Sequence, residues 1–303
     1  MAAFEGAARL GFRYVETDVH ATADGVLLAF HDPHLDRLTD QHGRIDRLEW
    51  SSLRHVRVAG TEPIARLEEL LGEFPDLRVN IEPKSDVAVE LLINTIRRTG
   101  AEMRVCVGSF SDRRLHRFRA VLPKVCTSMG RTETTGARLY SIGLPLRSGG
   151  AACAQVPVRW KGIRIVDRRF IRAMKQRGLQ THVWTVNDPG EMHRLIDLGV
   201  DGLMTDRPAQ LKAVLIARLH AWNKPARSRW KPISWPSSRT MKLLSPAAKP
   251  NRRNTPAAEP PQPYRNVITR MVEIWQIHTA WCQGELAQHA RLEDQISRHW
   301  SSQ

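Results

Sequence analysis

The sequence lacks the features that mark secreted and membrane-spanning proteins. Only four of its 303 residues are cysteine, with neither metal-binding spacing nor a paired framework, so we expect a reduced, cytoplasmic protein. No apolar run approaches the ~20 residues that span a membrane. The N-terminal segment MAAFEGAARLGF has neither the basic start nor the apolar core of a signal peptide. The cysteines are Cys106, Cys126, Cys153 and Cys282.

Acidic residues are scarce relative to basic ones. The chain has 46 Lys and Arg against 31 Asp and Glu, a net charge of +15. From Trp222 onward the ratio is 13 to 5, so the C-terminal part is the more basic for its length. Such a tail could contact an anionic membrane surface, or it could simply be solvated. No nucleic-acid-binding motif accompanies the charge, so we expect no nucleic-acid partner.

Strand-like and helix-like segments alternate over residues 1–221, which we interpret as one domain. This alternation predicts a parallel sheet covered by helices. It fits either an open doubly wound sheet or a (β/α)8 barrel, because periodicity alone does not choose between them. The expected strands lie near residues 12–19, 77–82, 104–109, 124–129, 152–158, 180–186 and 201–204.

The composition changes after the first domain. Residues 222–263 hold nine of the 18 prolines, mixed with Ser, Lys and Arg, and are predicted to be a linker. Residues 264–303 regain helical spacing of apolar side chains and are predicted to be a helical tail of unknown role. Such a helix could bind a partner or membrane surface, or fold back on the first domain.

One stretch, YVETDVHATADGVLLAFHD from Tyr14 to Asp32, combines several chemically active side chains. Glu16 and Asp18 are two apart on a predicted strand and therefore point to the same face. A turn and a second short strand then return His31 toward them. Two carboxylates with a nearby histidine suit a metal ion beside a proton-transfer group. Taken alone, the carboxylate pair usually lies on a solvated strand end, and the histidine motif usually forms a turn.

Four segments together resemble the glycerophosphodiester phosphodiesterases. They are ETDVHATADGVLLAFHDPHLDRLT, NIEPK, VWTVND and GVDGLMTDRP, in that order along the chain. The resemblance covers roughly residues 1–217. It implies a TIM-type (β/α)8 barrel and the metal-dependent hydrolysis of small-molecule glycerophosphodiesters to glycerol 3-phosphate and an alcohol.

The resemblance also implies site residues. It places a divalent cation on Glu16, Asp18 and Glu82, and their hard carboxylate oxygens suit Ca²⁺ or Mg²⁺ better than zinc. It places Lys84 on the phosphate, where a cation offsets the developing negative charge. In isolation, the Glu82 and Lys84 pair would read as a salt bridge at the sheet rim.

The proton-transfer group and the pocket walls are predicted in the same way. His31 matches one of the two histidines that the family uses as an acid/base pair. His20 is interpreted as a lining or supporting residue. Trp184 and Phe110 are expected to form walls of the substrate pocket, although core packing would explain them equally well.

One part of the family pattern has no counterpart. The family's barrel begins with a strand carrying His-Arg-Gly, whereas this sequence begins at Met1 in what resembles the helix after that strand. We therefore expect a barrel lacking its first strand, whether the native start lies upstream or the chain is truncated. The expected activity is weak, and the alternative is a non-catalytic homologue that binds phosphodiesters.

Overall fold

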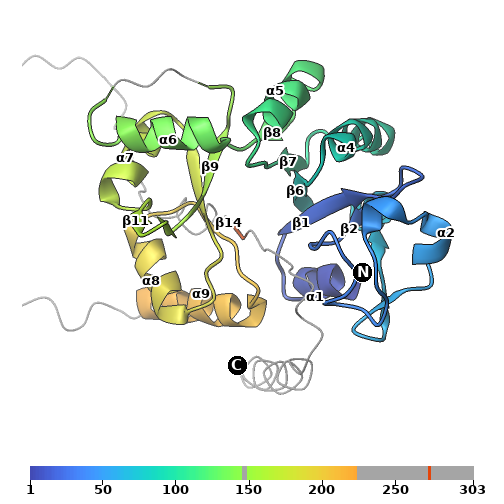
Figure 1. Ribbon diagram of the computed structural model, residues 1–303. Coiled ribbons are helices and arrows are strands. Elements are labelled where there is room, and N and C mark those ends of the chain that lie inside the picture. The colour runs from blue at the N-terminus through green and yellow to red at the C-terminus, as the bar shows by residue number, and fades with distance from the viewer. Residues whose placement is uncertain (145–148, 224–271, 274–303) are drawn as a thin grey trace, which may run out of the picture.

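The computed structural model describes residues 1–144, 149–223 and 272–273 (Figure 1). The α-helices in this part of the chain are α1 Ala2–Arg9, α2 Trp50–Leu53, α3 Leu67–Glu73, α4 Asp86–Thr99, α5 Asp112–Val121, α6 Arg131–Tyr140, α7 Arg168–Gln176, α8 Pro189–Leu198 and α9 Pro208–Asn223, with a short 3₁₀ helix at Ile45–Arg47. The strands are β1 Tyr14–Ala21, β2 Leu27–Ala29, β3 Arg57–Val58, β4 Glu62–Pro63, β5 Ala65–Arg66, β6 Arg78–Pro83, β7 Val105–Val107, β8 Cys126–Thr127, β9 Cys153–Pro157, β10 Arg159–Trp160, β11 Ile163–Arg164, β12 Gln180–Trp184, β13 Gly202–Leu203 and β14 Val272–Glu273.

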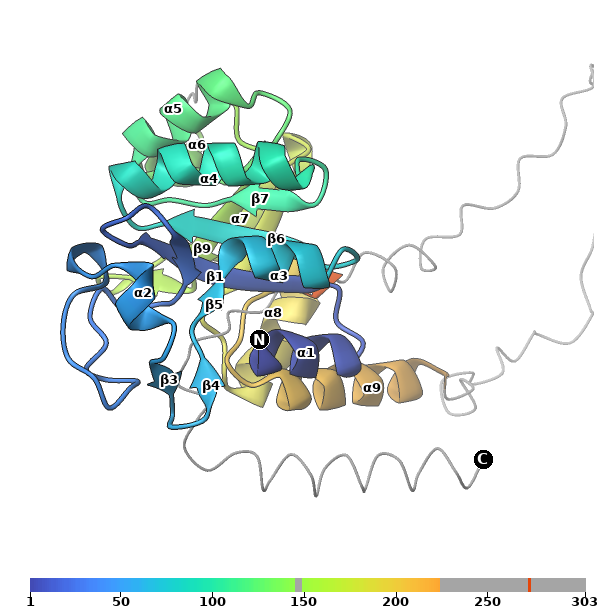
Figure 2. The ribbon, with the colours of Figure 1, turned by 90° about the vertical axis from the view of Figure 1, so that its right-hand side faces the viewer.

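The main strands form two sheets that meet at a seam. The first has the order β5-β2-β1-β6-β7-β8, and the second has the order β14-β13-β12-β9. An isolated parallel bridge between Ser128 and Cys153 joins them. The strands from β1 through β6, β7, β8, β9 and β12 to β13 are therefore neighbours in chain order, with helices on their outer side (Figures 1 and 2).

This arrangement confirms the predicted α/β fold and all seven expected strands. Among the described residues the barrel does not close, because β1 and β13 do not pair with each other. β14 pairs in parallel with β13 and lies beside β1. A helix was predicted over residues 264–303, and this is wrong for Val272–Glu273. The open edge of β13 offers unpaired backbone groups, which favour the addition of a strand there. Of the predicted linker and tail, the structure otherwise describes only Trp222 and Asn223, which end α9.

Local sequence signals fix several helix boundaries. The side chains of Ser111 and Asp167 accept hydrogen bonds from backbone amides in the first turns of α5 and α7, as N-caps do. Gly100 and Gly199 end α4 and α8 in the left-handed conformation, which glycine adopts without steric cost. These ends return the chain to the sheet and so place the next strand.

Each strand turns an apolar face toward the helices. Val15 and Ile81 pack in one buried cluster with α3, α4 and α5, and Val156 and Val183 pack in a second with α7 and α8. Because side chains alternate along a strand, the opposite faces of β1 and β6 carry Glu16, Asp18, Asn80 and Glu82. The polar side chains are thereby gathered on the inner side of the sheets.

Phe170 on α7 is expected to be a major contributor to stability. It is 0% exposed and lies in the cluster behind β9 and β12. Phe170→Ala should lower the free energy of unfolding by about 3–5 kcal/mol, because it leaves a cavity as well as losing buried apolar area. Urea unfolding measures this change. Met103→Ala is the control, since Met103 is 85% exposed and should change stability by no more than about 0.5 kcal/mol.

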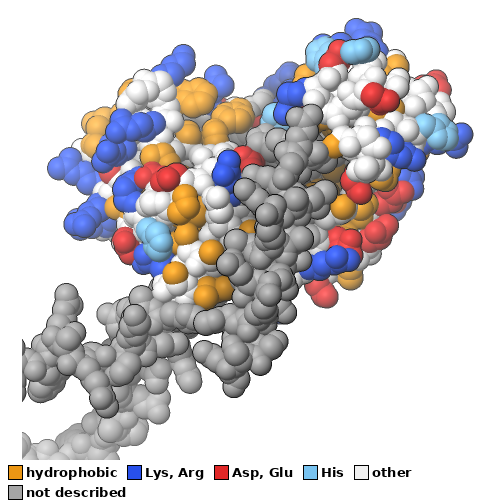
Figure 3. Space-filling model, turned by 90° about the horizontal axis from the view of Figure 1, so that it is seen from below, with side chains coloured by type: hydrophobic (Ala, Val, Ile, Leu, Met, Phe, Trp, Pro, Cys, Tyr) orange, Lys and Arg blue, Asp and Glu red, His pale blue; other side chains and the backbone are white. Residues whose placement is uncertain are grey.

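Two further observations concern the outside of the molecule. No helix among the described residues is long and apolar enough to cross a membrane. Viewed from the side of α1 and α9, basic side chains are interspersed with acidic and apolar ones on the described part of the face (Figure 3).

Candidate active site

The three predicted carboxylates converge at one end of the sheet. Glu16 and Asp18 lie on β1, and Glu82 lies on the adjacent parallel strand β6, directly opposite Asp18. Lys84 Nζ lies 2.8 Å from Asp18 Oδ1 and 3.1 Å from Glu82 Oε2. The side-chain alternation and the parallel register thus bring together four residues that the sequence singled out.

This cluster carries more negative charge than its single ammonium balances. Burial raises the pKa of Glu16 well above its usual range, and the neighbouring Asp18 and Glu82 raise it further. Burial also raises the pKa of Glu82, against the opposing effect of Lys84. A divalent cation would relieve this repulsion, and three carboxylates are the ligands that Ca²⁺ and Mg²⁺ prefer. The residues present therefore fit such an ion.

His31 reaches this cluster from a separate excursion of the chain. Residues 22–66 lie between β1 and α3; β2 and β5 extend the sheet beyond β1, and the segment also builds a small core of its own around Phe30 and Ile45. His31 Nδ1 lies 2.5 Å from Asp32 Oδ1, and His31 Nε2 lies 3.6 Å from Asp18 Oδ2. Asp32 thereby orients the ring so that Nε2 faces the carboxylates.

His20 supports this excursion from below. Its Nε2 donates a hydrogen bond of 3.1 Å to the carbonyl oxygen of His31. His20 is absent from the residues that line the large cavity described below. Of the two roles predicted for His20, the structure agrees with the supporting one. The lining role is wrong, because the ring points toward the backbone of His31.

The hydrogen bonds of Asp32 predict a pH-dependent contribution to stability. Two hydrogen bonds from Arg37, aided by one from His31, lower the pKa of Asp32 from 3.8 to about 2 despite partial burial. A lowered carboxyl pKa stabilises the folded state above the unfolded pKa, and this contribution is lost as the pH falls from about 4 to about 2.

Asp32→Asn should therefore lower the free energy of unfolding by about 1–2 kcal/mol at pH 7, allowing for solvent screening. The deficit should shrink as the pH falls below 4. Urea unfolding at several pH values measures it. Asp40→Asn, at an exposed position in the same excursion, is the control. A deficit that is the same at pH 7 and pH 3 would contradict the electrostatic explanation.

A cavity of about 700 Å³ opens beside the carboxylates. Glu16, Glu82, Lys84 and His31 line its polar end. The remaining wall is largely apolar. Its aromatic part consists of Phe110, which meets Trp184 edge-on at 5.7 Å between ring centroids and Trp160 at 6.4 Å. Trp184 and Phe110 thus line this cavity, and their role as walls of a substrate pocket stays a prediction.

Sequence reasoning missed several lining residues. Trp160 lies on the short hairpin of β10 and β11, which the predicted strands did not include. Gln155 on β9 donates a hydrogen bond of 2.8 Å from Nε2 to Asn80 Oδ1 and closes the cavity floor across the seam between the sheets. The alternation of side chains along β9 places Gln155 on the inner face, and this alternation could have identified it as a lining residue from the sequence.

The last two family-like segments hold each other at the strand ends. Asn187, which follows β12, donates from Nδ2 to Asp206 Oδ2 at 2.8 Å. Its Oδ1 accepts hydrogen bonds from the Thr205 hydroxyl and from the Asp206 backbone amide, both at 2.9 Å. These bonds hold the loop after β12 to the loop after β13. Asp206 in the second loop also contributes to the raised pKa of Glu16.

Comparison with known proteins agrees with this geometry. The model of the glycerophosphoryl diester phosphodiesterase family matches residues 1–210. A probable glycerophosphodiester phosphodiesterase of Mycobacterium tuberculosis is 42% identical over 228 residues, covering 72% of this chain and 85% of the relative. A lysophospholipase D of Rattus norvegicus is 25% identical over 253 residues, covering 71% of this chain and 81% of the relative.

A solved structure shows the same fold. The crystal structure of a glycerophosphodiester phosphodiesterase from Parabacteroides distasonis matches with a TM-score of 0.60 and 24% identity, covering 72% of this chain and 90% of that one. The family match spans most of the described residues and includes every side chain of the polar end of the cavity. The chain belongs to the glycerophosphoryl diester phosphodiesterase family, whose members are phosphoric diester hydrolases.

Proposed function

We propose that this chain hydrolyses glycerophosphodiesters to glycerol 3-phosphate and an alcohol, with a divalent cation held by Glu16, Asp18 and Glu82. The observation that carries this proposal is the meeting of three carboxylates, Lys84 and the Nε2 face of His31 at one end of a cavity. Carboxylate ligands favour Ca²⁺ or Mg²⁺. The strand order supports a barrel-type arrangement, with β14 in the gap between β13 and β1.

Each side chain has a distinct part in this chemistry. The cation, when bound, would offset negative charge on the phosphoryl oxygens. Lys84 holds the phosphate by its ammonium group. His31 transfers a proton at Nε2, since Asp32 occupies Nδ1 and holds the ring orientation. The apolar wall excludes water from the remainder of the substrate.

Hydrolysis of glycerophosphocholine tests the proposal. The purified full chain is dialysed against EDTA and assayed for released glycerol 3-phosphate with no metal, with Ca²⁺ and with Mg²⁺. We expect activity that depends on one of these ions. The alternative function, a homologue that binds phosphodiesters without cleaving them, predicts binding by calorimetry with no turnover under any of these conditions.

A second substrate class, the lysophospholipids, is favoured by the apolar wall. Phe110, Trp160 and Ile163 line the cavity, yet they are 46%, 45% and 64% exposed. Exposed apolar side chains grouped around a cavity are typical of sites for apolar ligands. A glycerophosphodiester bearing an acyl chain could place its phosphate at Lys84 and lay the chain along this wall.

Trp184→Ala should separate the two substrate classes. We expect kcat/KM for lysophosphatidylcholine to fall about 10-fold or more, because a large aromatic surface for the acyl chain is lost. For glycerophosphocholine the expected fall is no more than about 3-fold. Leu144→Ala, an exposed apolar residue outside the cavity lining, is the control. Equal losses on both substrates would show that Trp184 does not contact the acyl chain.

The cellular setting is a further part of the proposal. The lack of a paired cysteine framework supports a reduced, cytoplasmic setting, and the basic residues after Trp222 support contact with anionic membranes. Sedimentation with vesicles that contain phosphatidylserine, compared with vesicles of phosphatidylcholine alone, tests the membrane contact.

A further inference from the structure

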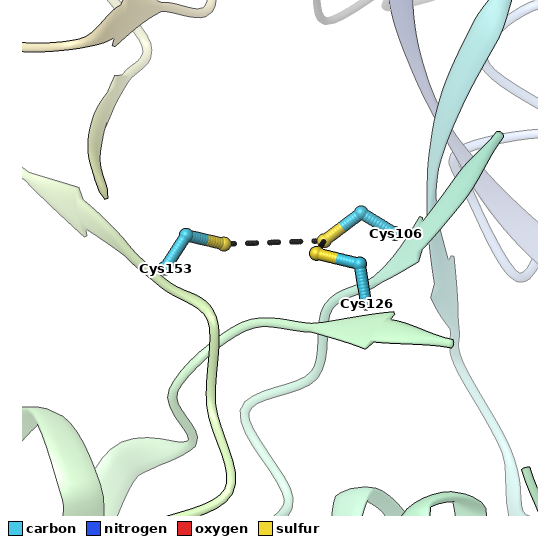
Figure 4. Close-up of side chains that lie close together, drawn as sticks. All are labelled: Cys106, Cys126 and Cys153. Carbon is cyan, nitrogen blue, oxygen red and sulfur yellow. Dashed lines mark hydrogen bonds between the residues drawn. The ribbon is translucent and has the colours of Figure 1, made fainter. Parts of the chain in front are cut away.

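Three of the four cysteines meet on the inner side of the sheets (Figure 4). Cys106 lies on β7, Cys126 lies directly opposite it on β8, and Cys153 begins β9. The Sγ atoms of Cys106 and Cys126 are 3.3 Å apart, those of Cys106 and Cys153 are 3.9 Å apart, and all three lie within 4.8 Å of one another. Cys153 is buried, and Cys106 and Cys126 are partly buried.

A buried histidine lies beside these thiols. His182 on β12 is 4% exposed, and neither of its ring nitrogens has a hydrogen-bond partner within the described structure. It lies directly opposite Gln155 in the pairing of β12 with β9, and Gln155 Nε2 lies 3.9 Å from Cys106 Sγ. Burial lowers the pKa of His182 to about 4, so its ring is neutral at physiological pH and keeps one nitrogen lone pair for a ligand. A buried imidazole without partners is costly unless something binds it.

We propose that Cys106, Cys126 and Cys153, with His182 as the fourth ligand, form a binding site for a soft divalent cation of the zinc class. Three sulfurs and one imidazole nitrogen are a ligand set that zinc adopts in structural sites. Zn–S bonds of about 2.3 Å at tetrahedral angles place sulfurs about 3.8 Å apart, which is close to the spacing observed here. His182 lies outside the tight group of three sulfurs, so its ring moves toward them when the cation binds.

The position of this site gives it a structural role. Cys106 and Cys126 belong to the first sheet, whereas Cys153 and His182 belong to the second. Among the described residues, one isolated bridge is the backbone pairing that joins these two sheets. A cation shared by the four side chains would fasten the sheets together at their seam. Gln155, which closes the cavity floor, also contacts Cys106 through Nε2 at 3.9 Å, so the cation would steady the base of the active site.

This site differs in chemistry from the carboxylate cluster. Thiolates and imidazole select soft cations, whereas Glu16, Asp18 and Glu82 select hard ones. The two sites can therefore be measured separately, without a substrate. The zinc-class site does not depend on the proposed hydrolytic function, and failure of either proposal leaves the other open.

The test is cobalt binding to the full chain in a Cys282→Ser background, which removes the fourth thiol of the sequence. Purified reduced protein is stripped with EDTA and titrated with Co²⁺, and the sulfur-to-cobalt charge-transfer absorption is recorded. Carboxylate ligands do not produce this absorption. We expect about one cobalt per chain with thiolate absorption, displaced by an equimolar amount of Zn²⁺.

Single variants then assign the ligands. Cys126→Ser should weaken Co²⁺ binding more than the ~10–100-fold typical of changes outside the ligand shell. His182→Ala should shift the absorption spectrum of bound cobalt, and His193→Ala on α8 should leave it unchanged. Cobalt bound without thiolate absorption would overturn the proposal. A disulfide between Cys106 and Cys126, found by mass spectrometry in the unsubstituted chain purified without reductant, would overturn it as well, and this second result needs no variant.

Discussion

Replacing His31 by alanine is expected to lower kcat for glycerophosphocholine by about 10²–10⁴-fold, the range typical for loss of a general acid or base. His31 Nε2 faces the carboxylate of Asp18, and its other nitrogen is engaged by Asp32. KM should change little, since in the proposed mechanism the phosphate is held by Lys84 and not by His31. Steady-state assays across pH 5–9 measure the effect, and the variant should also lose one limb of the pH–rate profile.

The control for this variant comes from the same excursion of the chain. His42 is 84% exposed at its side chain and pairs with Asp36 away from the cavity. His42→Ala should retain kcat within about 2-fold, because exposed pairs contribute little. A loss of less than about 5-fold in His31→Ala would show that another group transfers the proton, and His20 would then be the next residue to test.

Replacing Glu16 by glutamine is expected to abolish tight metal binding and lower activity about 10³-fold, which corresponds to several kcal/mol of transition-state stabilisation. The same substitution should raise the stability of the metal-free protein. A carboxyl whose pKa is raised by folding destabilises the folded state at every pH above its unfolded value of about 4.5. Glutamine keeps the shape of Glu16 and removes the charge that Asp18 and Glu82 repel.

Two measurements separate these effects. Calorimetric titration with Ca²⁺ or Mg²⁺ reports metal affinity, and thermal unfolding in EDTA reports stability. Glu90→Gln is the matched control, since Glu90 is an exposed partner of Arg117 far from the cluster. A metal-free Glu16→Gln protein that unfolds at a lower temperature than the parent would mean that Glu16 supports the fold rather than straining it.

The sequence predicted the polar end of the site because short-range rules govern it. Glu16 and Asp18 share a face by the two-residue period of a strand, and Asn80, Glu82 and Lys84 follow the same rule on the next strand. Neighbouring parallel strands end at the same edge, so the carboxylates had to meet. Resemblance to a family then assigned roles that spacing alone left open.

The cysteine cluster could not be found by the same reasoning. Cys106, Cys126 and Cys153 are far apart in the sequence and show none of the short spacings of zinc sites. Their meeting depends on the pairing register of β7 with β8 and on the bridge to β9, which are tertiary facts. The strand at Val272–Glu273 was missed for a related reason. It forms by pairing with the edge of β13, and the periodicity of its own sequence does not predict that pairing.

The excursion that carries His31 has a consequence for how the enzyme fails on heating. The carboxylates stand on the central strands β1 and β6, whereas the histidine follows the short strand β2 in a segment that has its own small core around Leu28, Phe30 and Ile45. A separately packed segment can open at a lower free energy than the sheet it rests on. Warming should then silence turnover before the central strands unfold, so that an inactivated sample recovers its activity on cooling.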